Sequence, residues 1–328
     1  MSALNTIAAR TVVGDHVRPR ITARIVICCA LSILAEGYDV GIVGASLLAL
    51  QVEPGWTSDP VMLGMLSSAS LLGMLIGAAV VGTYASTKGL RQPLALCVAG
   101  FSLASIGCGL APNPLVFALF RFLGGIAMGG IVPVAASYTI EFSPHATRLR
   151  NYGLMYSGYS LGIMLVATLA ITMIPAFGWR SLFLLGGVPL LLAPFLLAVM
   201  PESLQFLVSR GREAEARALA LRLGIDDRLI PALMDKGADE APSSARATLG
   251  VLFSPRYARA SICFWLALAM ALMLIYAAGT WLPSLMRARG LALGSSLATL
   301  AVFSLAGAAG GIASGWLADR LGQRRVIA

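Results

Sequence analysis

Charged side chains are scarce in this sequence. They account for 12% of the 328 residues, whereas hydrophobic side chains account for 58%, and the mean hydropathy is +0.83. Soluble domains hold about 25% charged residues, so this composition excludes an ordinary soluble protein. It predicts a polytopic membrane protein, and the apolar segments described below are long enough to predict an all-α one.

Groups that serve enzymatic chemistry are also few. The only histidines are His16 and His145, both outside the apolar segments, and the five cysteines show no pattern of a disulfide framework. The sequence contains no G-x-x-x-x-G-K-[ST] phosphate-binding loop and no cluster of metal-ligating residues. We therefore expect no enzymatic activity, no metal and no cofactor, with a proton as the coupling ion. The net charge of +9 is assigned to membrane topology rather than to nucleic-acid binding.

The sequence does have a series of apolar segments long enough to cross a bilayer, which takes about 20 residues. Eight such segments lie at residues 25–50, 61–83, 93–111, 114–138, 152–174, 181–200, 260–283 and 293–317. After Pro201 comes a short amphipathic stripe, followed by a polar linker without periodicity. We expect a six-helix bundle at residues 1–200, a cytoplasmic linker with a short amphipathic helix at 201–258, and the first two helices of a second bundle at 259–328.

Basic residues fall mostly on one side of the expected membrane. Segments assigned to the cytoplasm hold 20 of the 24 lysines and arginines, and the opposite side holds only Arg180, Arg287 and Arg289. Loops rich in lysine and arginine stay in the cytoplasm, so we expect both termini to lie inside, in a bacterial inner membrane. Nine basic residues lie in the central loop, as part of either a lipid-facing linker or a soluble interaction site.

Two carboxylates, Glu36 and Asp39, lie inside the first apolar segment. Glu36 is 11 residues from Ile25, or about 16 Å along a helix, which places it near the middle of the membrane. A charge there costs about 2.5–3.5 kcal/mol, so such groups normally face a protein interior or a water-filled cavity. The spacing puts both carboxylates on one helical face and favours a functional site. The alternative is a pair that extends toward the helix end to reach water.

Arg121, in the fourth segment, is the one basic residue that no loop accommodates. A cation there can neutralise a buried carboxylate or hold an anionic substrate. The alternative is an interfacial arginine that extends outward to water. Gly125 and Gly129 follow it and favour close helix packing.

Two loops of similar sequence follow the second helix of each group. G-T-Y-A-S-T-K-G-L-R begins at Gly82, and G-W-L-A-D-R-L-G-Q-R-R begins at Gly315. A repeat of this kind predicts two related bundles separated by the linker.

These motifs resemble those of the major facilitator superfamily of transporters. The loop from Gly315 is close to that superfamily's G-x-L-A-D-R-x-G-R-R signature, R-F-L-G-G-I-A-M-G-G from Arg121 resembles its fourth-helix motif, and P-E-S from Pro201 resembles its sixth-helix ending. Within the superfamily, E-G-Y-D from Glu36 is similar to the D-G-x-D of the aromatic acid:H⁺ symporter family. Residues 264–283 look like the seventh helix of that family.

The resemblance implies roles for particular residues. Glu36 and Asp39 would belong to the pathway of the proton and the substrate, and Arg121 would couple charge to conformation. The residues of the implied cytoplasmic gate motif are Gly315, Asp319, Arg320, Gly322 and Arg324. The first-half loop is a degenerate copy, in which serine and threonine replace the Asp–Arg pair, and its residues are Gly82, Ser86, Thr87, Gly89 and Arg91.

The function implied by the resemblance is proton-coupled uptake of an aromatic carboxylate such as a hydroxybenzoate. The expected partners are this small organic anion and membrane lipid. Two alternatives stay open: a transporter of sugars or other organic acids in the same superfamily, and a non-transporting remnant, sensor or scaffold.

The number of helices argues against transport by this chain alone, because the family has twelve spanning helices and eight are expected here. We therefore expect a truncated reading frame. We also expect that this chain, when it is expressed alone, does not accumulate the aromatic acid. The glycine face of the eighth helix, at Gly307, Gly311 and Gly315, would then meet lipid.

The charge distribution makes a testable prediction about topology. Single cysteines at Gly55 and Ser243, in a background without the native cysteines, should react with an impermeant thiol reagent from opposite sides of the membrane. Accessibility is measured in intact cells and in inverted vesicles. Labelling of both positions from outside would contradict the predicted orientation.

Overall fold

The computed structural model describes residues 13–56, 59–225, 253–255, 257–322 and 326. These residues are largely helical, and none of them lies in a strand, which confirms the all-α prediction. Within these ranges, eight helical stretches are long and apolar enough to cross a membrane. Their bounds are Pro19–Gln51, Val61–Lys88, Arg91–Gly109, Pro114–Phe142, His145–Phe177, Arg180–Val199, Ala258–Ala288 and Leu293–Leu321.

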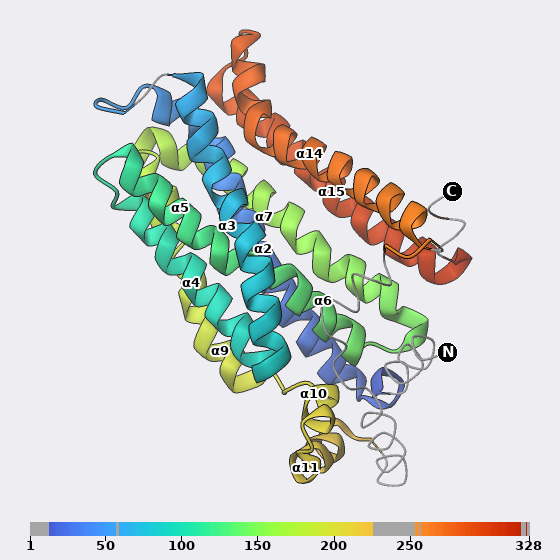
Figure 1. Ribbon diagram of the computed structural model, residues 1–328. Helices are drawn as coiled ribbons and strands as arrows, with labels where there is room; N and C mark the ends of the chain where they lie inside the picture. Colours follow the sequence, from blue (N-terminus) through green and yellow to red (C-terminus); the bar gives the residue numbers. More distant parts are fainter. Residues whose placement is uncertain (1–12, 57–58, 226–252, 256, 323–325, 327–328) are drawn as a thin grey trace.

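From α2 to α11, and again from α14 to α15, the helices follow one another with short connections (Figure 1). In order they are α2 (Pro19–Gln51), α3 (Pro60–Lys88), α4 (Arg91–Gly109), α5 (Pro114–Met128), α6 (Ile131–Phe142), η1 (His145–Thr147), α7 (Arg148–Phe177), α8 (Arg180–Leu185), η2 (Val188–Leu191), α9 (Leu192–Val199), α10 (Leu204–Ser209), α11 (Glu213–Leu223), α14 (Ala258–Ala288) and α15 (Leu293–Leu321). The fourth span comprises α5 and α6, and the sixth comprises α8, η2 and α9. Most of the expected linker, at residues 226–252, lies outside the described residues, so the division into three parts stays a prediction.

Local signals in the sequence account for several helix ends. The side chain of Asp59 accepts a hydrogen bond from the N–H of Val61 at the start of α3, and Asn113 caps α5 in the same way. Each cap precedes a proline at the first helical position, where the missing N–H costs nothing. Gly89 ends α3 with φ +88°, a conformation that residues with a side chain rarely adopt.

Glycines allow α2 and α7 to approach closely. A Cβ atom added to Gly162 of α7 would lie 2.1 Å from the carbonyl oxygen of Leu34 in α2. One added to Gly37 of α2 would lie 2.0 Å from the carbonyl oxygen of Tyr159 in α7. Backbone therefore packs against backbone at this crossing, as in many membrane helix pairs.

The same arrangement joins α3 to α5. A Cβ on Gly125 would lie 2.1 Å from the carbonyl oxygen of Ser70, and one on Gly73 would lie 2.2 Å from that of Phe122. The glycines after Arg121 thus serve the close packing expected of them, and they bring α3 within reach of the arginine.

The glycine face of α15 was expected to meet lipid, and that expectation was wrong. The two C-terminal helices lie side by side, with α15 along α7 (Figure 1). A Cβ on Gly315 would lie 2.6 Å from the carbonyl oxygen of Leu149 in α7, and one on Gly153 would lie 2.6 Å from that of Gly311. The small residues of α15 therefore pack on a helix of the first group, because α7 offers its own glycine at the crossing.

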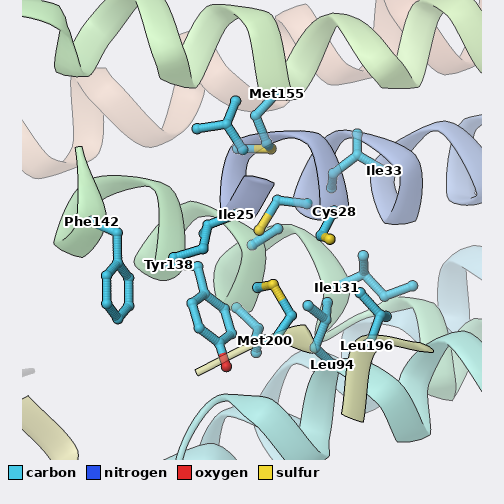
Figure 2. Packing of buried hydrophobic residues seen from close by; sticks show 14 of the residues in the cluster. Ile25, Cys28, Ile33, Leu94, Ile131, Tyr138, Phe142, Met155, Leu196 and Met200 are labelled. Carbon is cyan, nitrogen blue, oxygen red and sulfur yellow. The ribbon is translucent and has the colours of Figure 1, made fainter. Parts of the chain in front are cut away.

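A hydrophobic core fills the half of the bundle near the start of α2. Figure 2 shows Tyr138 and Phe142 of α6 beside Met200, with Ile25 and Cys28 of α2 above them. The hydroxyl of Tyr138 donates to the carbonyl of Pro201 at 2.9 Å, so its one polar atom is satisfied.

The expected amphipathic helix is α11, together with the short α10 before it. Its stripe is buried at Ala216, Ala220 and Leu223, and Leu219 is half-buried. The N–H of Arg18 donates to the carbonyl of Leu223 at 3.2 Å, which fastens the end of α11 to the start of α2.

Aromatic residues pack at the opposite end of the bundle. The rings of Trp56, Trp179 and Phe117 meet edge to face with centroids 4.9–5.9 Å apart. The guanidinium of Arg180 lies 4.4 Å from the Trp179 ring centroid and forms an ion pair with Glu53. This hydrogen-bonded arginine lowers the pKa of Glu53 below its usual range.

The crossing of α2 and α7 generates a prediction about stability. Gly162→Ala should lower the unfolding temperature, since overpacking a close contact typically costs about 1–3 kcal/mol. Gly310→Ala is the matched control, because a Cβ there meets nothing within 4 Å and alanine favours the helix. Thermal unfolding of the purified chain in detergent measures both variants. Equal unfolding temperatures for the two would show that the contact is not close.

Candidate functional site

A buried ion pair joins α2 to α5 in the interior of the bundle. Nη1 of Arg121 lies 2.6 Å from Oδ2 of Asp39, and these side chains are 3% and 2% exposed. The same nitrogen lies 3.5 Å from the carbonyl oxygen of Asp39. Neither residue reaches water, so the alternatives in which they extend to the membrane surface are excluded.

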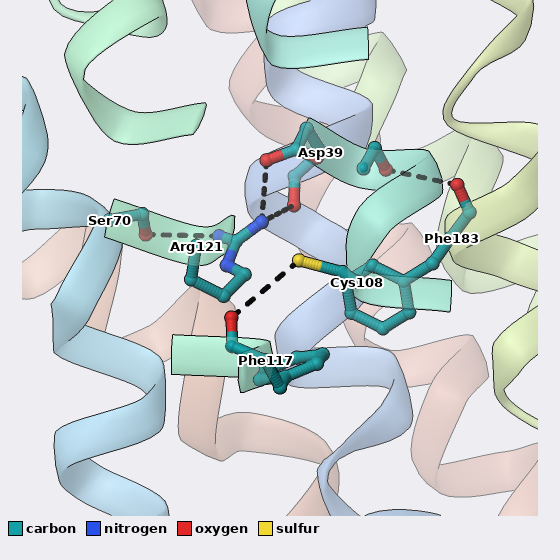
Figure 3. A network of polar contacts seen from close by, with 7 residues as sticks. Asp39, Ser70, Cys108, Phe117, Arg121 and Phe183 are labelled. Atoms are coloured by element: carbon teal, nitrogen blue, oxygen red, sulfur yellow. Dashed lines mark hydrogen bonds and ion pairs between the residues drawn. The ribbon is translucent and has the colours of Figure 1, made fainter. Parts of the chain in front are cut away.

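A third helix contributes to this pair. Nη2 of Arg121 donates to the hydroxyl of Ser70 in α3 at 2.9 Å (Figure 3). Ser70 is itself buried, and the glycine crossing of α3 and α5 brings it close to the arginine. Two helices therefore place three oxygen atoms around the guanidinium of α5, two from Asp39 of α2 and one from Ser70 of α3. Oδ1 of Asp39 and Nε of Arg121 have no hydrogen-bond partner among the described residues.

Glu36 lies one helical turn before Asp39 and has no such partner. Its side chain is fully buried, and neither carboxylate oxygen has a hydrogen-bond partner among the described residues. It borders a cavity of about 310 Å³, whose other walls include Met74 of α3, Met128 of α5 and Tyr276 of α14. The carboxylate is thus an uncompensated polar group beside a largely apolar hollow that lies between the first six spans and the seventh.

A row of tyrosines on α7 accompanies Glu36. Tyr152, Tyr156 and Tyr159 stack with centroids 6.2 and 6.0 Å apart and ring planes within 7° of parallel. Tyr276 faces Tyr156 and Tyr159 from α14, and Glu36 lies within electrostatic reach of all three. Sequence reasoning missed these tyrosines, although their spacing of four and then three residues places them on one helical face.

The expected cytoplasmic gate motif lies where α15 meets the start of α7. The carboxylate of Asp319 accepts hydrogen bonds from the N–H groups of Leu149 and Arg150 at 3.1 and 2.7 Å. These are free N–H groups of the first turn of α7, where a negative charge is favoured. The aspartate therefore links the second group of helices to the first. Gly315 packs on α7 beside it.

The other residues of this motif are peripheral to that contact. The guanidinium of Arg320 lies 4.0 Å from the Trp316 ring centroid, and Gly322 ends α15 with φ +84°. Arg324 lies outside the described residues.

The degenerate first-half loop is arranged differently. Ser86 and Thr87 donate to carbonyls within their own helix, at Thr83 and Tyr84. A Cβ atom added to Gly82 would meet nothing within 4 Å, so this glycine makes no close helix contact. The acceptor at this loop is Glu202 of the P-E-S motif, which takes the N–H groups of Leu90 and Arg91 at 2.8 and 3.4 Å.

Glu202 approaches the first-half loop from a distant part of the chain, since it lies 112 residues after Leu90. A Cβ at Gly89 would lie 2.4 Å from its carboxylate, so glycine is needed there for contact as well as for its positive φ. Sequence reasoning recognised P-E-S as an ending of the sixth helix but did not find this partner.

Comparison with known proteins bears on the whole arrangement. The profile of the Major Facilitator Superfamily matches residues 29–328. This chain belongs to the Major Facilitator Superfamily. It is therefore an integral membrane protein of a transporter family and not an enzyme.

Relatives and solved structures agree with this assignment. The chain is 33% identical over 302 residues to the benzoate transport protein of Acinetobacter baylyi, covering 90% of this chain and 64% of that protein. It is 34% identical over 310 residues to the gallate transporter of Pseudomonas putida, covering 93% and 67%. The chain thus spans about two thirds of the length of these relatives. The xylose transporter XylE from E. coli has the same fold, with a TM-score of 0.73 and 19% identity over 92% of this chain and 74% of that one.

The buried ion pair generates a prediction about stability. Asp39→Leu should destabilise the chain by about 3–5 kcal/mol, because it leaves the guanidinium uncompensated. The double variant Asp39→Leu/Arg121→Leu should recover most of this loss. Arg180→Gln, at the half-exposed pair with Glu53, should cost less than about 1 kcal/mol. Detergent unfolding titrations compare the variants. A double variant no more stable than Asp39→Leu alone would contradict the pairing.

Proposed function

We propose that this chain belongs to a proton-coupled transporter that takes up small aromatic carboxylates across a bacterial inner membrane. The observation that carries the proposal is the group of buried residues around Glu36. This carboxylate has no hydrogen-bond partner among the described residues, and both the Asp39–Arg121 ion pair and the tyrosines of α7 and α14 lie near it. Both the negative charge of such a substrate and the proton that accompanies it have a candidate partner there: Arg121 for the charge and Glu36 for the proton.

Glu36 is the group that we assign to the proton. An isolated buried carboxylate is costly when it is charged, and binding a proton removes that cost. Asp39 differs, because Arg121 already offsets its charge at 2.6 Å. The two carboxylates of one helical face thus have different surroundings. That difference suits one for exchanging a proton and the other for responding to a change in charge.

Arg121 is the group that we assign to the anion. It is the only fully buried basic side chain among the described residues. A substrate carboxylate that reaches it would compete with Asp39 for the guanidinium, and a proton on Glu36 would offset the added negative charge. The net charge of the buried site would stay the same, because an anion and a proton enter together. The pair in α2 and α5 would respond directly to the substrate.

The tyrosines suit the aromatic ring. Tyr276 of α14 borders the cavity beside Glu36, and the parallel rings of α7 lie next to Tyr276. Stacked or edge-to-face aromatic contacts contribute about 0.5–1.5 kcal/mol each beyond simple burial. Since α14 belongs to the second group of helices, a ring held there would contact both groups. Substrates in transporters of this kind bind between the two halves, near the bilayer midplane.

The relatives support this substrate class, because benzoate and gallate are both aromatic carboxylates. The xylose transporter shares the fold at 19% identity and carries no argument for a sugar. A non-transporting remnant, sensor or scaffold remains the alternative from a different class, and the uptake experiment below distinguishes it.

The test is uptake of labelled 4-hydroxybenzoate by cells that express the intact gene. Asp39→Asn and Glu36→Gln should each abolish accumulation driven by an inward proton gradient, because the proton and the anion can no longer be balanced in the membrane. Glu53→Gln is the matched control, since this carboxylate lies outside the spanning segments, and it should retain uptake.

Two results would overturn the proposal. Normal uptake and normal pH dependence in both buried variants would show that the carboxylates are structural. Absence of protonophore-sensitive uptake in the unmodified protein, for benzoate, gallate and 4-hydroxybenzoate alike, would favour the non-transporting alternative.

A further inference from the structure

A second cavity, of about 780 Å³, lies at the end of the bundle that the charge distribution assigns to the cytoplasm. Its walls come from the first turns of α2, the turn between α3 and α4, the end of α9 and one side of α11. It contains neither Glu36 nor Asp39, so the proposed transport function makes no use of it.

The charges around this cavity are unbalanced. Its acidic residues are Glu202 and Glu215, and its basic residues are Arg24, Lys88, Arg91, Arg212 and Arg222. Glu202 accepts hydrogen bonds from backbone N–H groups, and Glu215 forms two hydrogen bonds with Arg212. Four basic side chains therefore face the cavity without a carboxylate partner among the described residues.

One of these side chains is an unsatisfied donor. Nε of Arg91 is buried and has no hydrogen-bond partner among the described residues. A buried donor on a charged group is costly when it is left unpaired, and an oxygen-rich anion in the cavity would satisfy it. The cavity thus offers both a net positive charge and a specific donor that lacks an acceptor.

The remaining wall is apolar. Ile21 and Ile25 of α2, Val199 at the end of α9 and Leu219 of α11 line the cavity beside the basic residues. Ile25 and Val199 belong to helices long and apolar enough to span the membrane, so this apolar wall is formed at the ends of spanning helices. A small soluble anion would leave the apolar wall uncovered, whereas a phospholipid has a charged headgroup and an apolar body that match both parts.

We propose that this cavity binds the phosphate headgroup of an anionic phospholipid from the cytoplasmic leaflet. The phosphate lies among Arg24, Arg91 and Arg222, and the acyl chains descend along α9. Basic pockets at the cytoplasmic ends of spanning helices are suited to such headgroups. The lipid fastens α11 to the bundle, in addition to the backbone hydrogen bond from Arg18 to Leu223.

Native mass spectrometry of the purified full chain tests the proposal. Phosphatidylglycerol is titrated against phosphatidylcholine with the same acyl chains, and the apparent Kd of the first bound lipid is measured. Phosphatidylglycerol should bind more tightly. Arg24→Gln/Arg222→Gln should weaken its binding roughly 25-fold, about fivefold for each residue, given that a basic residue near an anionic lipid contributes about 1 kcal/mol.

Three controls make the result specific. Arg24→Lys/Arg222→Lys retains the charge and should retain most of the binding, which separates lost charge from lost folding. Arg259→Gln removes a cation from the start of α14, on the same side but outside the cavity, and should leave the Kd unchanged. Excess inorganic phosphate should not displace the lipid, because it lacks the apolar body.

Several outcomes would overturn the assignment. Equal affinity for the two lipids would show that the headgroup charge is not recognised. An equal loss in Arg259→Gln and in the cavity variant would reduce the effect to general surface charge. Displacement by inorganic phosphate would identify a site for a soluble anion instead of a lipid.

Discussion

The ion pair between Asp39 and Arg121 is the constraint on which this structure depends. A lone charge of either sign would be costly in the membrane interior, and the two groups offset each other only if α2 and α5 hold them within hydrogen-bond distance. Ser70 of α3 adds a third fixed point on the guanidinium. These three helices must therefore keep their relative positions, and any movement that separates them leaves a buried charge without its partner.

Glycine makes these positions possible. The backbones of α3 and α5 approach so closely at Gly73 and Gly125 that a methyl group would collide with a carbonyl, and the crossing of α2 and α7 behaves in the same way. Close approach of α7 also brings its tyrosines to the face of α2 that holds Glu36. The same small residues on α15 join the last two helices to α7. The same glycines therefore determine both the helix packing and the arrangement of the site, because the close helix crossings also bring the polar groups together.

The sequence predicted some of this well. Apolar length identified the eight spans found among the described residues, and the cost of charge in lipid singled out Glu36, Asp39 and Arg121, since these properties are local to each segment. Partners could not be predicted. Asp39 and Arg121 are 82 residues apart, Ser70 resembles other serines of membrane helices, and Glu202 reaches Leu90 across 112 residues. The glycine face of α15 was assigned to lipid because its partner, α7, lies in the other group of helices and only the tertiary arrangement reveals it.

The central claim is that the buried polar residues bind a proton and an aromatic anion together. Isothermal titration of 4-hydroxybenzoate into the purified chain, in two buffers with different ionisation enthalpies, tests it most directly. If the account is right, the observed heat differs between the buffers because a proton is taken up with the acid, and this difference disappears in Glu36→Gln. Binding with the same heat in both buffers, in the unmodified chain, would contradict it.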